Sequence, residues 1–202
     1  MERKSILVTL MLLAVVLLAG CSSDDENKSL VVWDISPVVF HVFITDSEGH
    51  DLLDSTYHDN IIKEVTATYQ DETYPLTTDL EFYDKKYGKA STRAYRPTFY
   101  GLLLRPYWSH KTFTNNGFEI TFGEFNGTEN VDKREITLNM PYNQQLRLAY
   151  KNSFRWSNGD PDKKTVFYLN DQELTDETGH YGYFNFRFSK TRGYEYIASE
   201  VK

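Results

Sequence analysis

The chain has 202 residues, a formal net charge of −7 at pH 7 and a single cysteine. This length fits one domain of roughly 100–200 residues, which is long enough to bury a core without cross-links. The negative charge argues against a nucleic-acid partner, because phosphates are bound through lysine and arginine. A single cysteine excludes an intrachain disulfide and a zinc site built from several thiolates. Packing therefore has to stabilise the fold, and 15 tyrosines and 13 phenylalanines supply large rings for it.

The first twenty residues have the pattern of an export signal. Arg3 and Lys4 give a basic start, and residues 6–19 are apolar and uncharged. A membrane-spanning helix is the alternative interpretation, but it needs roughly 20 apolar residues and this run is shorter. We therefore expect residues 1–20 to be a signal peptide, residues 21–30 an acidic tether and residues 31–202 a single folded domain.

Residues 18–21 read Leu-Ala-Gly-Cys, which resembles the lipobox of bacterial lipoproteins. The resemblance implies cleavage before Cys21 and acylation of its thiol and new amine. Each buried CH₂ contributes ~0.8 kcal/mol, and stable anchoring needs more than one chain, which a multiply acylated cysteine provides.

Residues 22–26 (SSDDE) resemble the acidic tag that follows the lipidated cysteine in surface-exposed lipoproteins of the Bacteroidota. That resemblance implies a lipid-anchored protein of the outer membrane that faces the cell exterior. A plain polar linker, which any lipoprotein can carry, is the alternative interpretation.

The domain itself reads as a series of strands. Residues 38–44 are β-branched and aromatic on both faces, which predicts a strand buried on both sides. Residues 46–49 then supply turn chemistry. Residues 60–67 are ambiguous, and their valine and threonine content favours a strand.

Five segments of the domain alternate between apolar and polar residues with a period of two, which is typical of antiparallel strands packed on one core. Their apolar members are Val65, Ala67 and Tyr69; Phe118, Ile120 and Phe122; Ile136, Leu138 and Met140; Leu146, Leu148 and Tyr150; and Phe184, Phe186 and Phe188. Turn formers lie between these runs, at 115–117, 126–127, 141–143, 157–161 and 170–171. We expect an all-β fold with little helix, a single two-sheet antiparallel sandwich that is immunoglobulin-like or related.

Residues 46–54 (DSEGHDLLD) resemble a signature of surface lipoproteins of gut Bacteroidota, in which an acidic turn with glycine precedes Asp-Leu-Leu. Residues 135–150 and 165–171 are similar to the same group. The group has no catalytic motif to transfer, so the resemblance implies fold and location alone.

Acidic residues and histidines are the side chains of this sequence that could bind a metal ion. The candidate calcium ligands are Asp46, Glu48, Asp51 and Asp54, and a weaker set is Asn158, Asp160 and Asp162. The alternative interpretation, which we favour, is a turn whose carboxylates bond the local backbone. The histidines at 41, 50, 58, 110 and 180 show no paired ligand spacing, although His50 and His58 flank one loop. We expect no metal and no other cofactor.

Residues 95–108 interleave aromatic and arginine side chains, which are the types enriched where proteins bind ligands and partners. The candidate ligand-binding residues are Tyr95, Arg96, Tyr100, Arg105, Tyr107 and Trp108. The competing interpretation, given more weight, is a core strand at 102–104 whose aromatic neighbours pack beside it. Trp33 and Trp156 are expected in the core.

No catalytic motif of a serine hydrolase, a phosphate-binding loop or a zinc protease occurs, so an enzyme is not expected. The sequence favours a lipid-anchored binding or assembly protein, with a glycan or an outer-membrane protein as partner. The alternatives are a hydrolase of surface polysaccharide or peptide, and a structural envelope protein without a small ligand. Ser55 lies in a short motif that resembles an O-glycosylation acceptor of the Bacteroidota.

Overall fold

The structure is a computed structural model that describes residues 34–78, 99, 101–108, 115–175 and 181–198. The chain divides into two units, Met1–Asp34 and Ile35–Lys202, and every element below belongs to the second. The signal peptide, Cys21, the tether and Trp33 lie outside the described residues. None of the described residues belongs to a helix long and apolar enough to cross a membrane.

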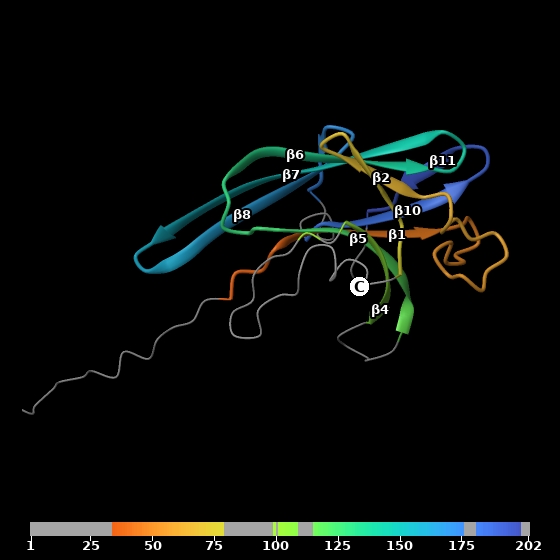
Figure 1. The fold of residues 1–202 in the computed structure, drawn as a ribbon, viewed down its shortest axis with the longest axis horizontal. Helices are drawn as coiled ribbons and strands as arrows, with labels where there is room; N and C mark the ends of the chain where they lie inside the picture. The colour runs from red at the N-terminus through yellow and green to blue at the C-terminus, as the bar shows by residue number, and fades with distance from the viewer. Residues whose placement is uncertain (1–33, 79–98, 100, 109–114, 176–180, 199–202) are drawn as a thin grey trace, which may run out of the picture. The chain divides into compact units, whose positions relative to one another are not determined.

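The domain is an all-β sandwich of two sheets that do not close on each other (Figure 1). The first sheet has the order β11-β10-β1-β5-β4 and the second has the order β3-β2-β6-β7-β8-β9. The strands of the first sheet are β1 (Val38–Thr45), β4 (Leu102–Trp108), β5 (Asn115–Phe125), β10 (Tyr183–Ser189) and β11 (Gly193–Tyr196). Those of the second are β2 (Thr66–Tyr69), β3 (Glu72–Pro75), β6 (Val131–Met140), β7 (Gln144–Ser157), β8 (Asp160–Leu169) and β9 (Gln172–Glu173). The fold class expected from the alternating segments is confirmed.

Strand β1 lies at the centre of the first sheet and organises it. It pairs antiparallel with β5 and parallel with β10, with His41 opposite Tyr183. The other strand pairs of both sheets, within the described residues, are antiparallel. Even-numbered residues of β1 are buried and odd-numbered ones are half-buried. The strand expected to be buried on both sides is therefore buried on its even-numbered face alone, because that face meets the second sheet and the odd-numbered face is only partly covered.

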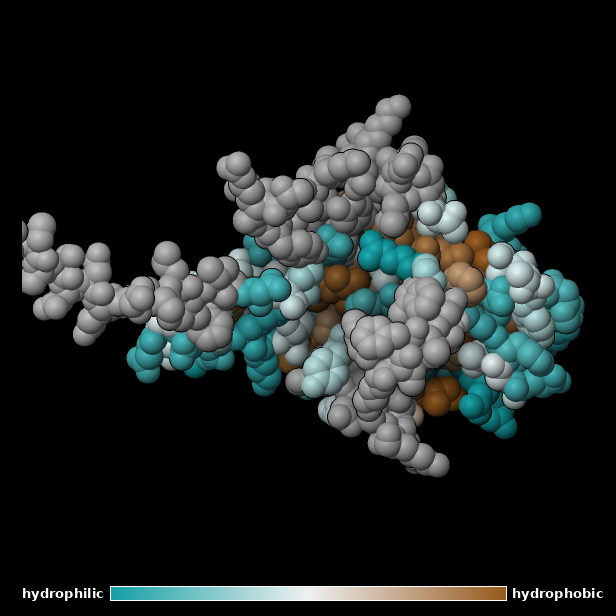
Figure 2. Space-filling model, turned by 90° about the horizontal axis from the view of Figure 1, so that it is seen from below, coloured by the Kyte–Doolittle hydropathy of each residue, from teal (hydrophilic) through white to brown (hydrophobic). Residues whose placement is uncertain are grey.

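Aromatic rings fill the space between the sheets. Phe40 of β1 lies within 6.3 Å, between ring centroids, of Phe125, Tyr150, Phe167 and Phe184, which come from both sheets. Every apolar member of the five predicted alternating segments is buried in this core or packs against it. Seen from below the view of Figure 1, hydrophobic side chains are visible between more hydrophilic ends of the described surface (Figure 2).

Three other local expectations were wrong. Residues 115–117 belong to β5 instead of a turn, because Gly117 takes a φ of 115° within the strand and Asp51 accepts the next amide proton, from Phe118. The strand expected over residues 60–67 begins only at Thr66. Trp156, expected in the core, is 57% exposed, because it lies beyond Asn152, the last buried residue of β7.

Candidate functional site

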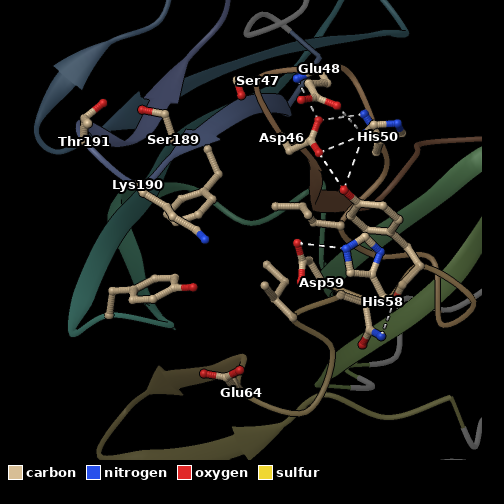
Figure 3. Close-up of a pocket in the computed structure, with 16 residues that line it drawn as sticks. Asp46, Ser47, Glu48, His50, His58, Asp59, Glu64, Ser189, Lys190 and Thr191 are labelled. Atoms are coloured by element: carbon tan, nitrogen blue, oxygen red, sulfur yellow. Dashed lines mark hydrogen bonds and ion pairs between the residues drawn. The ribbon is translucent and has the colours of Figure 1, made fainter.

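A pocket of about 840 Å³ lies where β1 and β10 end (Figure 3). Three connections line it: residues 46–64 after β1, the β6–β7 turn and the β10–β11 turn. The labelled side chain of Lys190 reaches into the space between Ser189 and Asp59, and Glu64 lies at the opposite margin from Asp46 (Figure 3). The volume of the pocket falls within the roughly 300–1,000 Å³ typical of small-ligand sites.

The connection after β1 is folded by its own carboxylates. Asp46 Oδ1 accepts hydrogen bonds from the backbone N–H groups of Glu48 (2.8 Å) and His50 (2.9 Å). Leu52 and Leu53 are buried and fasten the connection to the core. Backbone bonds from Leu52 N to Ile44 O and from Ile61 N to Leu52 O hold both of its ends. The pocket wall is therefore a fixed loop.

The four candidate calcium ligands do not converge on one point: Asp46 and Glu48 both face His50, whereas Asp51 and Asp54 bond other groups. Asp51 accepts from Leu53 N and Phe118 N, and Asp54 accepts from Thr56 N. Like Asp46, they bond the backbone. Within the described part of the chain, no cluster of three or more histidine, cysteine or acidic side chains is arranged to hold a metal ion. Ser55 is exposed in the same connection.

Asp46, His50 and Tyr57 form a charged group on the pocket wall. Asp46 Oδ2 accepts from His50 Nδ1 (2.8 Å) and from the Tyr57 hydroxyl (2.9 Å), and the two rings stack with centroids 5.0 Å apart. Burial raises the pKa of Asp46, but hydrogen bonds from His50, Tyr57 and the backbone outweigh it and hold that pKa well below its ordinary value.

The same contacts shift the partners of Asp46. The hydrogen bond to Asp46, and then its charge, raise the pKa of His50 above 6.5. The hydrogen bond to Asp46, followed by burial, raises the pKa of Tyr57 to about 12. Asp46 is thus held ionised with both oxygens occupied, so it shapes the pocket wall and is poorly placed to react.

An exposed tyrosine borders the pocket on the opposite sheet. Tyr142 and Asn143, in the β6–β7 turn, have φ values of 63° and 56°, which fit a tight hairpin turn. The Tyr142 ring stacks almost parallel on Phe188, at 5.2 Å and 8°, and remains 66% exposed. Phe188 is held in turn against Tyr194, at 4.8 Å. Phe188 therefore supports a flat, solvent-facing ring, and we call the pair the aromatic platform.

Carboxylates outnumber ammonium groups around the pocket. The acidic lining residues are Asp46, Glu48, Asp59 and Glu64, whereas the lining lysine is Lys190. His50 carries a positive charge below its raised pKa, and His58 Nε2 lies 3.3 Å from Asp59. The field in the pocket is therefore negative, and it disfavours anionic ligands.

Of the six predicted aromatic and arginine residues, the structure describes the side chains of Arg105 and Tyr107, and neither lines this pocket. Tyr95, Arg96 and Tyr100 lie outside the described residues, and of Trp108 the structure describes the backbone, which pairs with Asn115 at the end of β4. Leu102 and Leu103 are buried, as expected for a core strand.

Arg105 and Tyr107 lie on the face of the first sheet opposite the sandwich core. Tyr107 contacts Phe43 edge-on at 4.9 Å, and Arg105 pairs in register with Glu119. Glu119 bonds His41 Nδ1 at 2.9 Å. The Arg105 Nε atom is buried and has no hydrogen-bond partner among the described residues. These residues form a second cluster, separate from the pocket.

Sequence reasoning missed the aromatic platform. The turn at 141–143 was predicted, but its ring stacks on Phe188, which is far away in the chain. One usable signal was present: a tyrosine in a three-residue hairpin turn has no core to enter and must either face solvent or stack on a neighbour.

The chain matches no family model, and neither a curated protein nor a solved structure proved similar to it.

Proposed function

We propose that the protein is a lipid-anchored binding protein of the cell surface that holds a carbohydrate in the pocket between the 46–64 connection and the aromatic platform. The observation that carries the proposal is the Tyr142 ring, which is 66% exposed yet fixed by parallel stacking on Phe188. A sugar ring has an apolar C–H face and a rim of hydroxyl groups. A flat, preformed aromatic surface matches that face at small entropic cost.

The polar lining supports the same ligand class. Glu48, Asp59 and Glu64 offer carboxylate oxygens to sugar hydroxyl groups, and hydrogen bonds to charged acceptors are stronger than neutral ones. Lys190 offers a donor from the other side of the pocket (Figure 3). Because carboxylates dominate, we expect neutral sugars or amino sugars to bind better than uronic or sulfated ones.

Binding fits the pocket better than hydrolysis does. A glycosidase needs a carboxylic acid that stays protonated near neutral pH, beside a second carboxylate. Asp46 is instead held ionised, with hydrogen bonds on both oxygens. The proposed location is the outer membrane, through lipid on Cys21 and facing the exterior, and the sequence motifs at residues 18–26 support it. An outer-membrane protein that receives the glycan is the partner that such a location favours.

A glycan array followed by calorimetric titration tests the proposal. Tyr142→Ala should weaken binding of a neutral glycan roughly tenfold or more, which is ~1.4 kcal/mol. The matched control is Tyr181→Ala, which removes a ring of similar exposure, 64%, that does not line this pocket. Unchanged affinity in Tyr142→Ala, or no binding to any glycan of the array, would overturn the proposal.

A further inference from the structure

The long β7–β8 hairpin carries an exposed tryptophan and a half-buried phenylalanine near its tip. Strands β7 and β8 pair from Leu148–Leu169 to Ser157–Asp160, and the tip projects past the other strands (Figure 1). Burial on β7 ends at Asn152. Beyond it, Phe154 is half-buried and Trp156 is 57% exposed. The two rings meet edge-on at 5.5 Å, so they hold each other at the end of the hairpin.

The tip carries a small excess of cations, Arg155, Lys163 and Lys164 against Asp160 and Asp162, although the chain as a whole has a charge of −7. Arg155 bonds Asp162 across the hairpin at 2.7 Å and Lys164 pairs with Ser153, so both of these cations lie on the face opposite Phe154 and Trp156. Lys163 lies on the same face as Trp156 and donates to the backbone oxygen of Ser36 at 2.7 Å. The tip therefore combines an indole ring with the half-buried Lys163 on its own face and with Arg155 and Lys164 on the opposite face, whereas carboxylates predominate at the pocket.

The bond from Lys163 to Ser36 also shows where the chain enters the domain. Ser36 lies two residues before β1, so β1 starts beside the hairpin and ends at the pocket. Only residues 22–33 separate Cys21 from the first described residue, Asp34. Even fully extended, they reach about 40 Å at roughly 3.4 Å per residue. A membrane that holds lipid on Cys21 is therefore within reach of the hairpin end.

We propose that the tip of the β7–β8 hairpin, with Trp156 and Phe154, inserts into the headgroup region of the membrane that anchors the chain. Tryptophan concentrates at membrane–water interfaces, where its ring is buried and its N–H stays hydrated. Lysine and arginine near the surface are attracted to anionic lipids. With the tip inserted, the pocket at the far end of β1 faces away from the membrane. This inference rests on the proposed lipid anchor.

The experiment uses the full, processed chain, reconstituted in vesicles of phosphatidylethanolamine and phosphatidylglycerol. The acyl chains are brominated in one sample and ordinary in the other, because bromine quenches tryptophan at short range. The chain has three tryptophans, and Trp33→Phe with Trp108→Phe leaves Trp156 as the single emitter. Its emission should shift to shorter wavelength on reconstitution and lose most of its intensity in the brominated vesicles.

A matched probe is placed at the other end of the domain. Removing all three tryptophans and adding Tyr142→Trp puts an indole at a site of similar exposure beside the pocket. That emission should be the same in both kinds of vesicle. If the multiple variants fold poorly, quenching by bromine is compared in the native chain and in Trp156→Phe. The difference between the two is the quenching of Trp156.

Two failures are distinguishable. Acylated protein whose Trp156 emission is equal in brominated and ordinary vesicles overturns the membrane contact alone, and a protein partner for the tip would then be the explanation of its exposure. Mass spectrometry of the N-terminal peptide reports acylation separately, and a chain without lipid on Cys21 overturns both this inference and the proposed anchoring.

Discussion

The two ends of the sandwich use aromatic residues in opposite ways. At the pocket, Tyr142 stacks flat on Phe188 and is surrounded by carboxylates. At the hairpin tip, Trp156 meets Phe154 edge-on, and Lys163 lies on the same face. One strand joins the two ends, because β1 begins next to Ser36 and leads directly into Asp46. Its eight residues correspond to about 26 Å.

This difference bears on how an anchored binding domain is built. The flat ring among carboxylates suits a neutral, hydroxyl-rich ligand, whereas the edge-on pair, with a small excess of cations near it, suits the headgroup region of a membrane. Both ends need a rigid core to keep them apart. A substitution at either end can be read as a change in binding only if the core, and not that end, supplies the free energy of folding.

The core should give the largest effect. Phe186 of β10 is 2% exposed and packs between the sheets, so Phe186→Ala should cost ~3–5 kcal/mol of unfolding free energy. Asn185→Ala, on the opposite face of the same strand, should cost about 0.5 kcal/mol or less. Denaturant melts of both variants measure the difference. Equal losses would show that the two faces of β10 contribute equally, and the core would not be the source of rigidity.

The strands of this core were predictable because their signal is local. Alternation along five segments places each apolar side chain on one face, and the core uses all of them. The aromatic platform was not predictable in the same way. It forms because the β6–β7 turn and β10 belong to different sheets that meet at one end, and no local pattern encodes that meeting.

Trp156 shows a case in which a local sequence pattern predicts the wrong burial. Trp156 was expected in the core, and in β7 it lies on the same face as the buried Leu148 and Tyr150, yet it is exposed. A residue on the core-facing side of a strand is buried only where the other sheet covers it. The extent of the other sheet is not encoded in the sequence of that strand. The parallel pairing of β1 with β10 likewise depends on segments far apart in the chain.

The pocket wall should respond to pH through Asp46 and His50. The pKa of His50 is raised in the folded protein, so its bond to Asp46 stabilises the loop fully below pH 6.5 and is lost as pH rises through the folded pKa. The pKa of Asp46 is lowered, so its contribution is present above about pH 4 and is lost only in strong acid. The 46–64 connection is thus most stable between about pH 4 and pH 6.5.

Proton NMR titration of the His50 ring checks this expectation. In the native chain its pKa should lie above 6.5, and Asp46→Asn should bring it back toward that value by removing the charge that holds the proton. Tyr57→Phe keeps the carboxylate and is the matched control, so His50 should still titrate above 6.5 in that variant. A His50 pKa that Asp46→Asn leaves in place would mean that another group sets it.

The smallest effect on stability is expected at the hairpin tip, where the contrast with the core is sharpest. Trp156 is 57% exposed, so Trp156→Ala should change the unfolding free energy by only about 0.5 kcal/mol. Phe167 lies on the same hairpin and is 4% exposed, and Phe167→Ala should cost ~3–5 kcal/mol. Both changes remove an aromatic ring from the β7–β8 pair, so strand propensity is lost in each and the remaining difference reports burial. The measurement is denaturant unfolding of the chain without vesicles. A loss of several kcal/mol in Trp156→Ala would mean that the ring stabilises the domain itself, which contradicts a role in membrane contact.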